Sequence, residues 1–182
     1  MAWVGPYPSA PPGDFNSLGF AIGQVRGART WRVREDGMLE GPVYKQAWTP
    51  GENLALCRVP SKANAAKEFE APPREHLPNC RCGFYGYYDN SNDYYRPSKT
   101  PFGRNYVAGM FEGYGEVLIG ARGFRCTKAR IVAIHFPDTF VDPRLVFEVY
   151  PDLPVFLKFE QMIAAFPCEG MVEPEPLKEL EA

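Results

Sequence analysis

Proline and glycine recur so densely along this chain that short strands and turns are favoured over long helices. The 182 residues include 19 prolines and 17 glycines, about a fifth of the total. Both residue types interrupt regular structure, and glycine also permits the tight turns that join neighbouring strands. Hydrophobic residues make up 45% of the chain, an ordinary fraction for a globular core. The sequence therefore predicts an α+β fold, mainly an antiparallel sheet of hairpins and a meander, with a C-terminal helix.

Hydrophobic periodicity places the individual elements. Residues 30–34 alternate polar and apolar side chains, and a Glu-Asp-Gly turn leads to a returning strand, so this stretch predicts a hairpin. Four apolar residues at helical spacing predict a helix over 159–166. Residues 145–150 fit a helix or a strand equally well. The remaining predicted strands are 38–44, 54–59, 106–111, 115–121 and 123–136.

The two ends differ in composition from the middle. Residues 1–28 begin with a stretch containing four prolines and are predicted to be an extended arm, either loose or docked through its aromatic side chains. Residues 29–168 are predicted to form a single β-rich domain. Residues 169–182 hold five glutamates against one lysine, which predicts a solvated acidic tail.

Charge and hydropathy exclude several classes of protein. The net charge of −2 argues against a dominant non-specific nucleic-acid binder, which needs a basic excess. No apolar run approaches the roughly 20 residues that span a bilayer. The first residues lack the basic and apolar regions of a signal peptide, which predicts a cytoplasmic protein. In that reducing compartment the five cysteines are expected to be thiols or metal ligands and not disulfides.

The densest chemical signal is a Cys/His cluster at the centre of the chain. His76, Cys80 and Cys82 lie within seven positions, and Cys57 lies in the predicted strand 54–59. Three cysteines and one histidine are a recognised ligand set for structural zinc, which leaves no open coordination position for catalysis. The spacing leaves alternatives open, because C-x-C is less diagnostic than paired C-x2-C motifs. Plain thiols or a redox pair at Cys80 and Cys82 fit the same residues.

Two further segments suggest contacts with other molecules. Aromatic and cationic residues of the arm and of a polar loop over 89–105 predict a partner-binding surface: Trp3, Tyr7, Tyr94, Tyr95, Arg96, Lys99 and Arg104. Such residues are common in adaptable protein-binding loops, although an inert insertion fits the loop as well. The alternative partner is a nucleic acid, contacted through the same tyrosines and a basic stretch formed by Arg122, Arg125, Lys128 and Arg130. An edge strand protected by charges also accounts for that basic stretch.

A catalytic site has little support in the sequence. No serine lies in a Gly-x-Ser-x-Gly motif, and no glycine-rich phosphate loop follows a predicted strand. His135 follows an apolar run and is expected to be a core or strand-end residue. The chain is therefore predicted not to be an enzyme.

The order of several motifs resembles a family of short, uncharacterised proteins from actinobacteria and their phages. The resemblance covers roughly residues 29–166, and its most specific part is the block His76-Leu77-Pro78-Asn79-Cys80-Arg81-Cys82-Gly83-Phe84-Tyr85. The other matching motifs are Trp31-Arg32-Val33, Trp48-Thr49-Pro50-Gly51, Ala55-Leu56-Cys57, Gly115-Glu116-Val117, Gly123–Arg130 and Tyr150-Pro151-Asp152-Leu153-Pro154-Val155. The proline-rich arm and the 89–105 loop depart from the family pattern.

The resemblance implies a fold unit and the grouping of Cys57, His76, Cys80 and Cys82, but no reaction. We therefore expect a non-catalytic protein-binding module, an accessory protein of a phage or mobile element that acts on a host or phage protein. A nucleic-acid-binding accessory protein is the alternative function.

Overall fold

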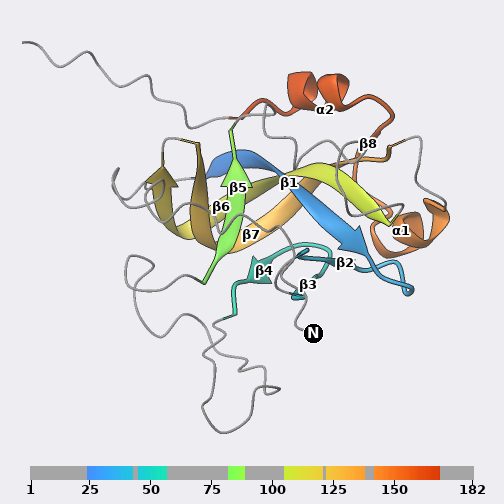
Figure 1. Ribbon diagram of the computed structural model, residues 1–182, viewed down its shortest axis with the longest axis horizontal. Helices are drawn as coiled ribbons and strands as arrows, with labels where there is room; N and C mark the ends of the chain where they lie inside the picture. Colours follow the sequence, from blue (N-terminus) through green and yellow to red (C-terminus); the bar gives the residue numbers. More distant parts are fainter. Residues whose placement is uncertain are drawn as a thin grey trace, which may run out of the picture.

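The computed structural model describes residues 24–42, 45–56, 82–88, 105–120, 122–137 and 142–168. These residues form the predicted α+β fold, a mainly antiparallel sheet with a C-terminal helix. The strands are β1 (Val25–Val33), β2 (Leu39–Glu40), β3 (Ala47–Trp48), β4 (Asn53–Leu54), β5 (Phe84–Tyr87), β6 (Tyr106–Gly120), β7 (Gly123–His135) and β8 (Val155–Phe156). The helices are α1 (Arg144–Val149) and α2 (Phe159–Ala165). Figure 1 shows α2 on one side of the sheet and the β2–β4 segment on the other.

Four of the strands close the sheet into a ring. β1 pairs with β6, β6 with β7, and β7 with β5, all antiparallel. β5 then returns to β1, where Ala28 lies opposite Tyr87. The short strand β5 therefore closes the ring, and side chains that point inward are enclosed by all four strands.

The ring is filled by aromatic side chains. Trp31, Trp48, Phe111 and Phe124 have an exposed fraction of 1% or less. Neighbouring rings meet edge to face or tilted, as for Trp31 and Trp48 with centroids 5.2 Å apart. The predicted alternation of β1 is confirmed on this face, because Trp31 and Val33 both belong to the enclosed core.

Such bulky rings fit in a small ring of strands only where the backbones approach closely. A Cβ atom on Gly123 would lie 2.1 Å from the carbonyl oxygen of Gly86, so glycine is required where β7 meets β5. Gly115 has a φ of 77° and lies at a register shift between β6 and β7. It forms a bulge where the sequence predicted a break between strands 106–111 and 115–121. That prediction was wrong, since β6 runs without interruption through both stretches.

The outer face of β1, β6 and β7 carries small residues and is covered by α2. Ala28, Ala108 and Ala133 pack there with Phe159 and Met162 of the helix. The helix predicted over 159–166 is confirmed, and its i, i+3 pair of Phe159 and Met162 faces the sheet.

Three further predictions have outcomes in the described part of the chain. The hairpin is confirmed, with Val33 opposite Leu39, but β1 begins at Val25, inside the stretch assigned to the arm. Residues 144–149 are helical, which settles the ambiguous segment. The edge-strand interpretation of the basic stretch is wrong, because β7 pairs with β6 along one edge and with β5, β4 and β8 along the other. Within the same ranges, no helix is long and apolar enough to cross a membrane.

Candidate functional site

The structure describes one residue of the predicted zinc site. Cys57, His76 and Cys80 lie outside the described residues. Cys82 is partly exposed and lies just before β5, where its carbonyl oxygen accepts a hydrogen bond from Arg125 Nη1 at 3.4 Å. Within the described ranges no group of three or more His, Cys, Asp or Glu residues is placed to hold a metal ion. Zinc therefore stays a prediction.

The remaining two described cysteines pack against strand β5. Cys126 is fully buried inside the ring, and its thiol donates a hydrogen bond to the Phe84 carbonyl at 3.7 Å. Burial raises the pKa of Cys126 to about 12, so this thiol remains protonated at neutral pH. Cys168 donates to the Tyr87 carbonyl at 3.8 Å, at the other end of the same strand.

The partner-binding residues predicted from sequence, Trp3, Tyr7, Tyr94, Tyr95, Arg96, Lys99 and Arg104, lie outside the described residues. The basic residues proposed for nucleic acid are described, and they differ in environment. Arg122 is exposed beside β7, whereas Arg125 is 4% exposed and its guanidinium lies 5.8 Å from the centre of the Tyr85 ring. The structure therefore does not gather these two cations on one exposed surface.

The other two basic residues are paired with carboxylates. Lys128 Nζ lies 3.2 Å from Glu52 on the segment before β4. Arg130 Nε lies 2.6 Å from Glu112 on β6. A phosphate would have to compete with both carboxylates for these cations.

Glu112 joins three strands and the end of α2. Its carboxylate accepts hydrogen bonds from Arg26 Nη2 at 2.8 Å and from Arg130 Nε at 2.6 Å. Arg26 also lies 5.8 Å from the centre of the Phe166 ring and donates to the Pro167 carbonyl at 3.4 Å. Burial alone would raise the pKa of Glu112, but the hydrogen bonds from the two guanidinium groups outweigh it and lower the pKa below its ordinary value of 4.5. The ionised form is therefore the one that the folded chain stabilises.

Replacing Glu112 with glutamine is expected to lower the free energy of unfolding at pH 7 by about 2 kcal/mol, because two charge-assisted hydrogen bonds are lost. A carboxylate whose folded pKa is lowered stabilises the fold above its unfolded pKa and loses that contribution as pH falls through the folded pKa. The difference between wild type and Glu112→Gln should therefore shrink as pH falls below 4.5. Urea denaturation between pH 7 and pH 3 measures this difference in the free energy of unfolding.

Asp142→Asn, which removes an exposed ion pair with Arg144, is the control and should change stability much less. A difference independent of pH would contradict the assignment.

Tyr150 organises a site that sequence analysis did not single out. Its hydroxyl accepts a hydrogen bond from the Leu39 amide at 3.0 Å and donates one to the Trp48 carbonyl. Burial raises the pKa of Tyr150, so the hydroxyl keeps its proton and can make both bonds. The residue therefore fixes the turn after α1 against β2 and β3.

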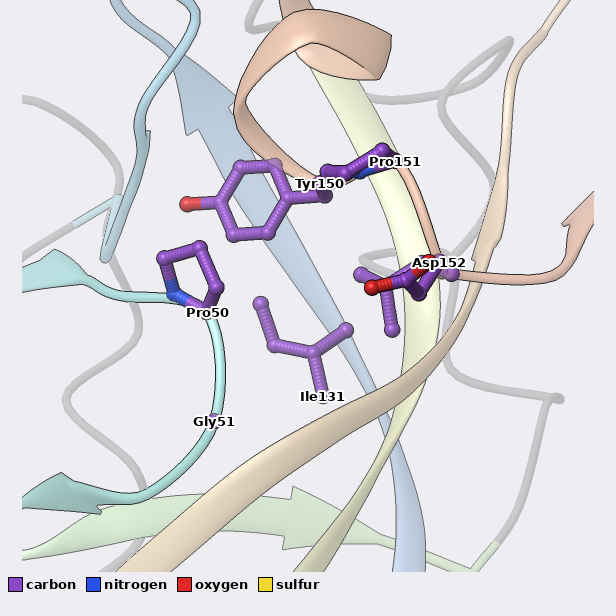
Figure 2. A pocket seen from close by; sticks show the side chains of 7 residues that line it. Pro50, Gly51, Ile131, Tyr150, Pro151 and Asp152 are labelled. Atoms are coloured by element: carbon purple, nitrogen blue, oxygen red, sulfur yellow. The ribbon is translucent and has the colours of Figure 1, made fainter.

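A small pocket opens beside this tyrosine. It has a volume of about 130 Å³ and is lined by Pro50, Gly51, Ile131, Tyr150, Pro151, Asp152 and Leu153. Figure 2 shows the Tyr150 ring, Pro50 and Ile131 facing a common hollow, with Asp152 at its side. Both lining turns belong to motifs of the family resemblance, but no pattern in the sequence shows that two turns about a hundred positions apart meet.

Apolar side chains are also exposed on the helix that precedes this pocket. The side chains of Leu145 and Phe147, both on the six-residue helix α1, are 39% and 41% exposed. The Phe147 ring rests on Phe136, with centroids 5.6 Å apart. We call Leu145 and Phe147 the α1 surface.

Comparison with known proteins found no matching protein-family model, no matching curated protein and no matching solved structure. The resemblance to the actinobacterial and phage family therefore stays a prediction, and the function has to be argued from the chain itself.

Proposed function

We propose that this chain is a non-catalytic module that binds another protein, as an accessory protein of a phage or mobile element acting on a host or phage protein in the cytoplasm. The observation that carries the proposal is the α1 surface beside the Tyr150 pocket. The α1 surface exposes two apolar side chains, and the turn that follows α1 lines the pocket together with Pro50, Gly51 and Ile131.

The α1 surface has the properties of a binding anchor. Aromatic side chains held in place before binding contribute strongly to protein interfaces, because little conformational entropy is lost when they are covered. Phe147 is held in this way by its contact with Phe136, while two fifths of its surface is exposed. On the inner side of the helix Val146 is buried, so α1 is fixed to the domain.

The proposal gives the zinc a structural role. A set of three cysteines and one histidine completes the tetrahedron of the metal and offers no position for substrate. Cys82 lies two positions before β5, the strand that closes the ring, and a bound ion there would stabilise the fold without taking part in a reaction. Together with the lack of a catalytic motif in the sequence, this supports binding as the activity.

The nucleic-acid alternative has weaker support. Two of its four basic residues, Lys128 and Arg130, already face carboxylates at 3.2 and 2.6 Å, and Arg125 is buried. No observation on the described residues favours it over protein contact.

Phe147→Glu is expected to abolish capture of the partner while leaving the fold intact, since the side chain is 41% exposed. A charge at this position cannot be desolvated against an apolar partner surface without a large penalty. Immobilised wild-type and variant chains are incubated with an actinobacterial lysate, and bound proteins are quantified by mass spectrometry. Leu54→Glu is the matched control, because Leu54 is 43% exposed on a different element. It should retain the same partner.

Two results would contradict the proposal. Equal loss in both variants would show that capture is non-specific hydrophobic adsorption. Binding of DNA or RNA that weakens steeply with salt, without any protein partner, would favour the alternative function.

A further inference from the structure

The Tyr150 pocket has the size of one small side chain. Cavities of about 150 Å³ lined by aliphatic and aromatic residues hold a benzene molecule. This pocket, at about 130 Å³, accommodates a group slightly smaller than that. Ile131 of β7 provides a buried wall, with 7% of its surface exposed, and the two turns provide the other walls.

The lining of the pocket offers few groups for hydrogen bonding. Pro50 and Pro151 have no amide hydrogen. The Tyr150 hydroxyl is already hydrogen-bonded to the backbone of Leu39 and Trp48. The backbone carbonyl of Tyr150 accepts a hydrogen bond from the Leu153 amide at 3.3 Å. A polar group entering the pocket would lose its bonds to water without replacement, so the pocket selects apolar groups.

Asp152 gives the pocket a charge. It is the only ionisable carboxylate among the lining residues, it is exposed, and in the described part of the chain it has no ion-pair or hydrogen-bond partner. The neighbouring Glu52, by contrast, is paired with Lys128. A ligand that places a cation beside its apolar group is therefore complementary to this site.

We propose that the pocket binds a short segment of the partner protein in which an aliphatic side chain is followed by lysine or arginine. The aliphatic group enters the hollow between Pro50 and Tyr150, and the cation lies against Asp152. This inference rests on the proposed function, because it names the chemistry of the protein segment that the module recognises.

The test uses three capped dipeptides as probes: acetyl-Val-Arg-amide, acetyl-Val-Glu-amide and acetyl-Gly-Arg-amide. Each is titrated into the full ¹⁵N-labelled chain and followed by ¹H–¹⁵N NMR. Saturable shifts are expected at the amides of Gly51, Ile131, Asp152 and Leu153, with Val-Arg binding most tightly. An exposed ion pair should strengthen Val-Arg over Val-Glu by about two- to five-fold.

Asp152→Asn should remove the difference between Val-Arg and Val-Glu, while Glu160→Gln, an exposed carboxylate on α2, should leave it unchanged. Equal binding of all three peptides, or shifts confined to residues outside the pocket, would overturn the inference. That failure is separate from failure of the proposed function, because partner capture that depends on Phe147 would persist.

Discussion

Trp48→Ala is expected to lower the free energy of unfolding by about 3–5 kcal/mol, the range for removal of a large aromatic side chain from a core. Trp48 is 1% exposed although its strand has only two residues. Its ring contacts those of Trp31, Phe84 and Phe111, with centroids 5.2, 4.4 and 5.4 Å away. These three residues come from β1, β5 and β6, so the cavity would lie where three strands of the ring meet.

The loss is large beside the total stability of a natural domain, which is about 5–15 kcal/mol. Urea denaturation followed by far-UV circular dichroism measures it without relying on the fluorescence of the removed tryptophan. Leu54→Ala on the neighbouring β4 is the control, since its side chain is 43% exposed, and should change stability by about 0.5 kcal/mol or less. A Trp48→Ala variant as stable as this control would mean that Trp48 does not fill the ring.

Cys82→Ser is expected to remove one equivalent of zinc and to destabilise the chain by several kcal/mol, on the scale of the roughly 10–16 kcal/mol that structural zinc contributes in small metal-binding domains. Cys82 lies two positions before β5, and β5 is the strand that joins β1 to β7. Loss of the metal would therefore release the strand that closes the ring. Elemental analysis of protein purified without added zinc measures the metal, and thermal denaturation measures the stability.

Cys168→Ser is the matched control for this experiment. Cys168 is also partly exposed and also contacts β5, through the Tyr87 carbonyl, but it is not a predicted ligand. Its replacement should leave the zinc content unchanged. Wild-type protein that contains no metal and titrates with five reactive thiols after unfolding would refute the zinc prediction.

The sequence predicts those features that depend on neighbouring residues. Alternation in residues 30–34 identifies the β1 face that carries Trp31 and Val33, because side chains alternate between the faces of a strand. The spacing of Phe159 and Met162 identifies α2 in the same way, because residues three and four apart share one face of a helix. Residues 145–150 are too few for either period to be distinctive, and only the structure shows that Arg144–Val149 form the helix α1. The uninterrupted β6 was missed because Gly115 serves as a bulge as readily as a turn.

Only the tertiary structure decided which distant residues meet. Leu39 and Tyr150 are 111 positions apart and share a hydrogen bond. Arg26 and Glu112, which are separated by 86 positions, form an ion pair. The same pairing divides the basic stretch, since Arg130 is neutralised by a carboxylate of β6 and Arg125 is buried against Tyr85. The pocket also depends on residues that are distant in the sequence, because it forms between two turns. The sequence of each turn predicts a bend in the chain but not the contact with the other turn. Strand pairing brings such segments together, and it depends on how side chains fit across the closed ring. No local pattern of the sequence identifies which side chains will be partners in that ring.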